Sequence, residues 1–224
     1  MTPILVLRPQ PGADATAARI RARGLPVVVT PLFARVPLAW TPPPPDAVDH
    51  LLVTSAAVFD HGGAGLAAFR QLPLVAVGGA TAAAARAAGF THVAFMEGGD
   101  VHAAAALLAR RGARRVLHLA GADRMEADVP DATVMPIAVY ASRPAPPPDS
   151  FTRALVGPAI ALVHSARAGA RLGALVTDRD HLSIVAISAA AARAAGDGWR
   201  AVSVAAAPTD AAMVEQAAAL VHAG

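Results

Sequence analysis

The sequence predicts an α/β protein made of two similar, doubly wound parallel-sheet domains. The first observation behind this prediction is an internal repeat, in which three separate motifs return later in the chain. The matching pairs are residues 52–55 and 162–165, residues 75–78 and 185–188, and Asp100 and Asp210. Each pair is separated by 110 residues. A constant offset across separate motifs indicates two related units rather than chance matches.

The second observation is that short apolar runs alternate with Ala-rich stretches along the chain. The runs predict strands at residues 4–7, 27–30, 51–54, 74–77, 92–95, 116–119, 133–139, 160–163, 183–187 and 201–204. The stretches predict helices at residues 13–23, 58–70, 80–88, 101–110 and 211–222, and a short helix near Arg124. Such alternation is typical of parallel sheets covered on both faces, as in flavodoxin-like or Rossmann-like domains.

The third observation is a pair of proline clusters, at residues 42–45 and 144–148, which bracket the middle of the chain. Residues 1–33 form a βαβ piece too small to fold alone, so we expect them to join the C-terminal block. The predicted division is residues 1–34 plus 149–224 for domain one, 46–136 for domain two, and 35–45 and 137–148 for hinge strands and linkers. A two-stranded hinge would let the domains rock.

Composition excludes several classes of protein. Apolar residues make up 55% of the 224 residues, but the longest apolar stretches are shorter than the roughly 18 residues that a membrane span needs. The apolar run at residues 4–7 is too short for a signal-peptide core, so we expect a soluble, cytoplasmic protein with no membrane partner. Lysine is absent, which excludes a Schiff-base lysine and a P-loop lysine.

The charge and the histidines exclude two further kinds of site. A net charge of +3 with few aromatic residues gives little basis for binding nucleic acid. Cysteine is absent, and the eight histidines show no metal-ligand spacing, so we expect no metal site.

Small, hydroxyl-bearing or arginine residues follow several predicted strands. In open parallel sheets, ligands bind beyond the carboxyl ends of the strands, where helix N-termini present backbone amides to anions. The candidate binding residues at these positions are Arg8, Thr54, Ser55, Ala56, Thr81, Arg124, Ser165, Ala166 and Ser188. Each serine or threonine could instead only cap a helix, but the set as a whole favours an anion site.

Conventional catalytic groups are sparse. His164 and Ser165 are neighbours on the chain, so their side chains would point to opposite faces of a strand and make a poor dyad. The glycines at positions 63 and 65 come too late after the strand for a dinucleotide loop. Tyr140 is the only tyrosine and lies on the returning hinge strand. A lone tyrosine usually packs with its hydroxyl satisfied, so Tyr140 alone does not establish catalysis.

Several strings, in this order along the chain, resemble the uroporphyrinogen-III synthase family. They are residues 4–9 (ILVLRP), 53–56 (VTSA), 75–81 (VAVGGAT), 115–121 (RVLHLAG) with Arg124, 139–140 (VY) and 162–166 (LVHSA). The resemblance covers essentially the whole chain. It rests on the order and spacing of these strings and on the position of the single tyrosine.

The resemblance implies two α/β domains joined by a two-stranded ladder, and an enzyme without metal or cofactor. Its members close linear hydroxymethylbilane into a macrocycle, with loss of water and inversion of ring D. By resemblance, Tyr140 would help the hydroxyl to leave, while backbone amides and hydroxyls near Ser55, Thr81, Ser165 and Ser188 would hold acetate and propionate groups. We expect a monomer whose partner is the linear tetrapyrrole, with transient contact to the preceding pathway enzyme as an open question.

The chain departs from the family pattern in its second repeat. Ser188 is followed by three alanines where the family often shows a glycine and a threonine, and His164 stands where threonine or phenylalanine is more usual. Two alternatives stay open. One is a non-catalytic two-domain binder of a small polycarboxylate or other anion, which would not need Tyr140. The other is a nucleotide-sugar transferase, which usually needs a longer chain and a diphosphate site.

Overall fold

The computed structural model describes residues 2–223, and the chain forms two compact units. Unit 1 contains the residues up to Ala34 and those from Arg143 onward, and unit 2 contains Arg35–Ser142. The chain therefore passes between the units twice. The assignment of two independently folding domains that rock about a hinge stays a prediction.

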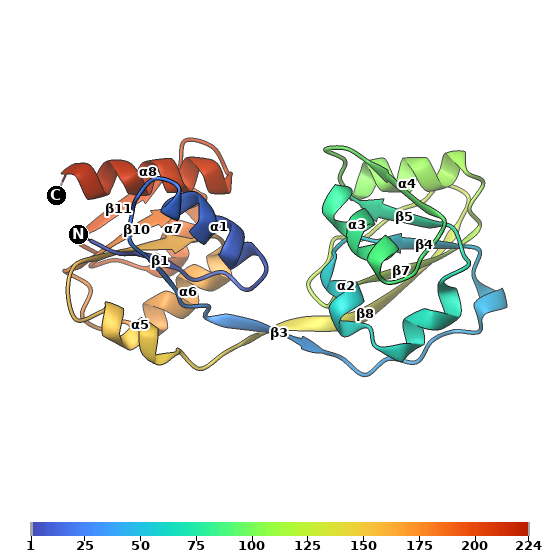
Figure 1. Cartoon of the computed structure of the whole chain (residues 1–224), viewed down its shortest axis with the longest axis horizontal. Coiled ribbons are helices and arrows are strands. Elements are labelled where there is room, and N and C mark those ends of the chain that lie inside the picture. The colour runs from blue at the N-terminus through green and yellow to red at the C-terminus, as the bar shows by residue number, and fades with distance from the viewer. Residues whose placement is uncertain (1, 224) are drawn as a thin grey trace. The chain divides into compact units, whose positions relative to one another are not determined.

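Unit 1 is built on a five-stranded sheet with the order β11-β10-β9-β1-β2 (Figure 1). The strands are β1 (Ile4–Val6), β2 (Val27–Val29), β9 (Ala159–Val163), β10 (Leu182–Ala186) and β11 (Ala201–Val204). Every neighbouring pair is parallel. The parallel sheet expected from the sequence is therefore confirmed in this unit.

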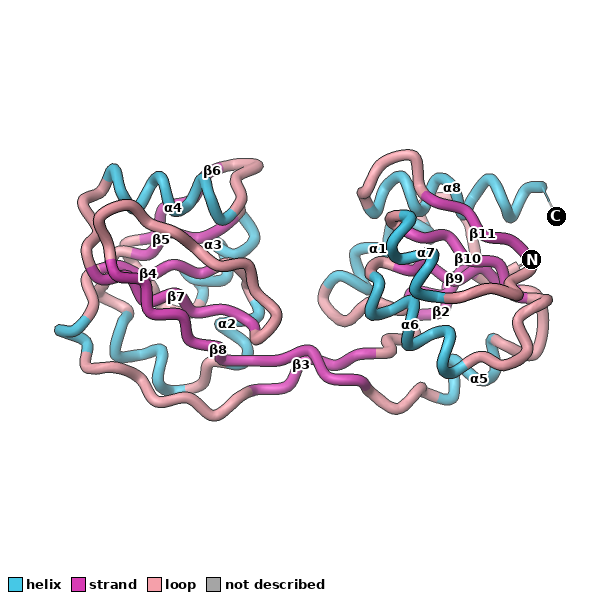
Figure 2. The backbone as a smooth tube through the Cα atoms, turned by 180° about the vertical axis from the view of Figure 1, so that it is seen from behind, coloured by secondary structure: helices cyan, strands magenta, loops and turns pink. Residues whose placement is uncertain are grey.

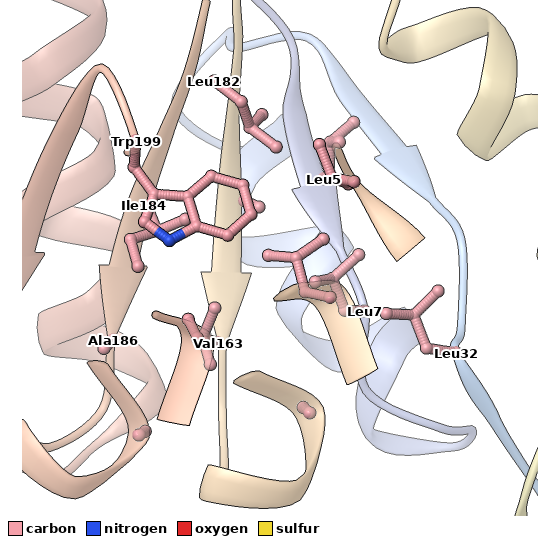
Figure 3. Close-up of a cluster of buried hydrophobic side chains, with 14 of the residues drawn as sticks. Leu5, Leu7, Leu32, Val163, Leu182, Ile184, Ala186 and Trp199 are labelled. Atoms are coloured by element: carbon pink, nitrogen blue, oxygen red, sulfur yellow. The ribbon is translucent and has the colours of Figure 1, made fainter. Parts of the chain in front are cut away.

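Helices cover both faces of this sheet. They are α1 (Gly12–Arg21), α5 (Asp149–Ala154), α6 (Ala166–Leu175), α7 (Ala189–Ala195) and α8 (Asp210–Ala223). Along β1 the side chains alternate: Ile4 and Val6 pack with residues of α1 and α8, whereas Leu5 packs on the opposite face with residues of α6 and α7. Figure 3 shows this second core, where the Trp199 ring lies near Leu182 and Ile184.

Unit 2 contains a six-stranded sheet with the order β3-β8-β7-β4-β5-β6 (Figure 2). The strands are β3 (Phe33–Pro37), β4 (His50–Val53), β5 (Leu74–Val77), β6 (Val93–Met96), β7 (Arg115–Gly121) and β8 (Thr133–Pro144). The pairs from β8 to β6 are parallel. β3 runs antiparallel to β8, because Leu38 N–H donates to Val139 O at 2.9 Å while Ala145 N–H donates to Leu32 O at 3.0 Å.

Among the described residues, unit 2 contains three α-helices, and one helix that the sequence predicted is divided in two. They are α2 (Ala57–His61), α3 (Gly79–Ala87) and α4 (Val101–Arg110), with 3-10 helices η1 (Pro45–Ala47) and η2 (Ala64–Phe69). The single helix expected at residues 58–70 is wrong. Gly63 adopts φ 64° and ψ −162°, a conformation that ends α2 and separates it from η2.

The helix expected near Arg124 is also wrong, since residues 122–132 are irregular. These residues connect the parallel strands β7 and β8. A crossover with a helix usually takes a dozen or more residues, and this connection is slightly shorter than that. In unit 1, residues 7–26 connect β1 to β2 and leave room for α1.

The repeat seen in the sequence is a repeat of topology. The order β8-β7-β4-β5-β6 in unit 2 matches the order β2-β1-β9-β10-β11 in unit 1. In unit 1, the first two strands of this series come from the start of the chain. The N-terminal piece is thus used to complete the C-terminal unit. None of the described helices is long and apolar enough to cross a membrane.

Candidate functional site

The carboxyl edge of the unit 1 sheet gathers polar residues from distant parts of the chain. Arg8 follows β1, His164 and Ser165 follow β9, and Ser188 follows β10. β1 and β9 are neighbours at the centre of the sheet, and the chain leaves them toward opposite sides. Ligand sites of open α/β sheets lie at such a switch point.

Asp210, the first residue of α8, receives four side chains at this edge. Its Oδ1 accepts from Thr16 Oγ1 at 2.6 Å, lies 2.9 Å from His164 Nε2 and 3.5 Å from Arg8 Nη1. Its Oδ2 pairs with Arg19 Nη1 at 2.5 Å. We call these five residues the Asp210 cluster. The cluster links α1, α8 and the loops after β1 and β9.

The protonation state of the cluster follows from its surroundings. Burial raises the pKa of Asp210, but hydrogen bonds from Thr16 and His164 and the charge of Arg19 lower it, so the pKa lies below its ordinary value. For His164, burial lowers the pKa more than the hydrogen bond to Asp210 raises it. Asp210 is therefore ionised and His164 neutral near pH 7, so Nε2–H of His164 donates to the carboxylate.

The two serines of unit 1 both cap helices. Ser165 Oγ accepts from Ala168 N at 3.1 Å at the start of α6, and Ser188 Oγ accepts from Ala191 N at 3.2 Å at the start of α7. Capping is thus their structural role. A capping oxygen still has its own O–H, so each hydroxyl keeps one donor for a ligand. Ala166 is the first residue of α6 and is exposed.

The carboxyl edge of unit 2 presents backbone amides more openly. Ser55 Oγ accepts from Ala57 N at 3.3 Å. Its neighbours in the sequence, Thr54 and Ala56, are half-buried. α3 begins after Gly78 without a side-chain cap, so its first N–H groups have no side-chain acceptor. Thr81 lies in this first turn and is only 5% exposed. The amides of α3 are better placed than the Thr81 side chain to receive an anion.

Tyr140 lies at the same edge of unit 2, opposite Gly121 at the end of β7. A Cβ atom on Gly121 would come within 2.8 Å of the tyrosine ring, so only glycine leaves room there. Arg35 lies over the ring at 5.8 Å, and the His61 ring lies 5.7 Å away. None of the described residues hydrogen-bonds the Tyr140 hydroxyl. The ring is packed while its hydroxyl is free.

Arg124 follows β7 in the irregular connection and is half buried, with its Nε lacking a partner among the described residues. Its charge acts on His118 of β7, which is fully buried. Burial, with the Arg124 charge as a smaller contribution, lowers the pKa of His118 to about 4. His118 lines a cavity of about 250 Å³ with Glu126, Ala127, Val134 and Pro136. Neither ring nitrogen of His118 has a partner in the described chain.

Two weaker candidates do not develop into sites. Gly65, from the glycine pair at positions 63 and 65, packs against Pro42 and Trp40, so it serves packing rather than a phosphate. Ligand atoms of Asp178, Asp180 and His181 lie within 4.8 Å of one another, but both carboxylates are exposed.

Comparison with known proteins identifies the family. The model of the uroporphyrinogen-III synthase HemD family matches residues 14–215. The chain belongs to the uroporphyrinogen-III synthase family. Membership places it in tetrapyrrole biosynthesis. The search of curated proteins found no match.

One solved structure of the family shares the fold, and another aligns with a lower score. A uroporphyrinogen-III synthetase from Helicobacter pylori is 16% identical with a TM-score of 0.64, and the match covers 98% of this chain and 100% of that one. The wild-type uroporphyrinogen III synthase of Thermus thermophilus is 16% identical with a TM-score of 0.43, covering 100% and 99% of the two chains. The α/β fold with mostly parallel sheets is confirmed.

The predicted site residues of this family member divide between the two units. Unit 1 carries Arg8, Ser165, Ala166 and Ser188, and unit 2 carries Thr54, Ser55, Ala56, Thr81, Arg124 and Tyr140. Within each unit they gather at the carboxyl ends of the strands, as the strand-end rule predicts.

Sequence analysis missed most of the Asp210 cluster. It recognised Asp210 only as a member of the internal repeat, and it set His164 aside because Ser165 was the only partner considered. The side chains of His118 and His164 are both buried, and sequence analysis assigned neither of them a role. One usable signal was present: His118 occupies the centre of the apolar run at residues 116–120, where a strand residue is buried.

Proposed function

We propose that this protein closes linear hydroxymethylbilane to uroporphyrinogen III, with inversion of ring D and release of water, and so acts as a lyase. Family membership and the two polar carboxyl edges support this reaction. We further propose that it works as a cytoplasmic monomer and needs no metal or cofactor, as the family resemblance implies.

The observation that carries the proposal is the free Tyr140 hydroxyl at the carboxyl edge of unit 2. The phenol O–H donates a proton to the terminal hydroxyl of the substrate as the C–O bond breaks, which releases water and leaves an electrophilic azafulvenium carbon. The α-carbon of ring D that already carries the bridge to ring C attacks this carbon and forms a new C–C bond, which gives a spiro intermediate. The bond between that α-carbon and its old bridge carbon then breaks, and the released electrophilic bridge carbon bonds to the free α-carbon of ring D, so that ring D is inverted. A proton is then lost from the substrate, which restores aromaticity and balances the proton that Tyr140 gave.

The sparse catalytic inventory suits this chemistry. The substrate carries eight carboxylates and becomes reactive once its hydroxyl leaves, so holding it in a folded geometry supplies much of the rate. We assign carboxylate binding to Arg8 and Arg124, to the hydroxyls of Thr54, Ser55, Thr81, Ser165 and Ser188, and to backbone at Ala56 and Ala166. The uncapped first turn of α3 supports this assignment, because its amides point outward from a positive helix end.

The test supplies enzymatically generated hydroxymethylbilane to the purified protein and separates the oxidised uroporphyrin isomers by chromatography. We expect type III to dominate. Type I alone, the product of uncatalysed closure, would support the non-catalytic polycarboxylate binder and overturn the enzyme proposal.

Tyr140→Phe tests the role of the hydroxyl. We expect turnover to fall about 100-fold, which is typical when a proton donor is removed, with little change in thermal unfolding because the ring packing is kept. Thr91→Val is the matched control, since it removes an exposed hydroxyl from the same unit. Equal turnover in wild type and Tyr140→Phe would remove Tyr140 from the mechanism.

A further inference from the structure

The Asp210 cluster holds its two arginines unequally. Oδ1 of Asp210 is already engaged by Thr16 at 2.6 Å and by His164 at 2.9 Å. Arg8, at 3.5 Å from the same oxygen, is the third and most distant donor. Because a carboxylate oxygen has about two lone-pair sites, Thr16 and His164 leave Arg8 only a weak contact.

The Asp210 cluster carries one net positive charge, because one carboxylate faces two arginines. Asp210 and Arg19 form a close pair, with the Asp210 side chain 14% exposed. His164 is neutral, for the reasons given above. Arg8 is therefore the cation whose charge is not cancelled within the cluster. A substrate that carries carboxylates would be attracted to this position despite the nearby Asp210.

Arg8 is also placed to bind a ligand. Its side chain is 35% exposed, and Asp210 is its only hydrogen-bond partner among the described residues. The guanidinium lies over the start of α1, where a Cβ on residue 12 would fall 2.6 Å from its Nε. Gly12 thus leaves space for the guanidinium. The N–H groups of Arg8 that do not face Asp210 can form the paired hydrogen bonds that a carboxylate accepts.

We propose that Arg8 binds one carboxylate of the substrate, and that His164 is a positioning residue which engages Asp210 Oδ1 and so keeps Asp210 from capturing Arg8. The proposal rests on the proposed function and extends it to a residue with no direct place in the reaction. If His164 is absent, Asp210 Oδ1 has one donor fewer and draws Arg8 into a close ion pair.

The test measures kcat and KM for hydroxymethylbilane in four variants. Arg8→Gln should raise KM about tenfold, as expected for one lost charge-assisted contact, and change kcat less than about twofold. His164→Leu should raise KM about fivefold, because Arg8 is then held by Asp210. His164→Gln keeps an N–H donor and should stay within about twofold of wild type. Arg21→Gln changes an exposed arginine at the end of α1 in the same unit and controls for the change of charge.

The double variant Arg8→Gln with His164→Leu separates positioning from a purely structural role. If His164 acts through Arg8, KM of the double variant should equal that of Arg8→Gln alone. Independent effects that multiply in KM would overturn the positioning role. So would an unchanged KM in His164→Leu accompanied only by a lower midpoint of thermal unfolding.

Failure of this inference can be told apart from failure of the proposed function. A wild-type protein that yields only the type I isomer fails as an enzyme, whatever its variants do. A wild type that yields type III while Arg8→Gln keeps its KM supports the enzyme and overturns the carboxylate site at Arg8.

Discussion

Asp100 in unit 2 and Asp210 in unit 1 occupy the same place in the repeat, yet their side chains have different partners. Asp100 is exposed and accepts from Ala103 N at 2.9 Å, so it only caps α4. Asp210 receives Thr16, His164 and two arginines. Equivalent sequence positions therefore predict equivalent backbone structure, but not an equivalent set of side-chain partners.

The units also differ in how one face of each sheet is covered. In unit 1, α1 packs Ala13 and Ile20 into the core beside β1. In unit 2, the irregular residues 122–132 take the equivalent place, and the cavity lined by His118 and Glu126 lies there. Unit 2 thus has no helix between β7 and β8, and the buried His118 beside this connection has no hydrogen-bond partner among the described residues.

A third difference concerns the starts of helices. Ser165 and Ser188 cap α6 and α7 in unit 1, whereas α3 of unit 2 follows Gly78, whose φ of 80° favours glycine. Capped helices use their first amides internally, and an uncapped helix leaves them for a ligand. We therefore propose that free backbone amides contribute more to substrate binding in unit 2, and that Arg8 contributes more than helix amides in unit 1.

The largest effect we expect is on the Tyr140 region. Gly121→Ala would place a Cβ within 2.8 Å of the Tyr140 ring and displace the hydroxyl. Because displacement of a reacting group by about 1 Å can cost about 100-fold, we expect kcat to fall by roughly that factor. Steady-state turnover with hydroxymethylbilane checks this.

Gly157→Ala in unit 1 is the matched control, since a Cβ there meets nothing within 4 Å. It should leave turnover unchanged. Normal kcat in a folded Gly121→Ala protein would show that the position of Tyr140 does not matter to the reaction.

The next effect concerns the cavity of unit 2 and depends on pH. With a native pKa of about 4, His118 stays neutral while the unfolded chain takes up a proton below about pH 6.5, so stability falls between these values as pH is lowered. His118→Leu removes this penalty. Between pH 7.5 and 4.5 we expect the variant to lose ~2.5 kcal/mol less unfolding free energy than wild type.

Urea unfolding at the two pH values measures the difference. His92→Gln is the control, because His92 is an exposed histidine of the same unit and should show the wild-type pH dependence. If His118→Leu and wild type lose the same free energy on acidification, His118 is not the buried neutral histidine described here.

The smallest effect contrasts the two repeat-related aspartates. Asp210→Ala leaves two arginines and His164 without their acceptor and should lower the free energy of unfolding by about 2 kcal/mol. Asp100→Ala removes a single exposed cap and should lower the midpoint of thermal unfolding less. Thermal scans of both variants test the order. A larger loss in Asp100→Ala would contradict the role given to the Asp210 cluster.

Sequence analysis located the strands and the candidate binding loops well, because both depend on neighbours along the chain. The strings at residues 52–55 and 162–165 led to Ser55 and Ser165, and both lie at carboxyl edges of their sheets. The short helix expected near Arg124 was wrong, because residues 122–132 form an irregular connection between β7 and β8. This connection is slightly shorter than a usual helical crossover. Sequence analysis also failed at Gly62–Gly63, where one left-handed glycine ends α2 early.

The sequence by itself determined the α/β class, the repeat and the strand-end loops, since apolar periodicity and turn residues act over a few neighbouring positions. Only the tertiary structure decided which side chains meet. Arg8 reaches Asp210 from 202 positions away, and Gly121 faces Tyr140 because of the pairing of β7 with β8. Such contacts depend on strand order and register, which bring distant residues together and which no local pattern records.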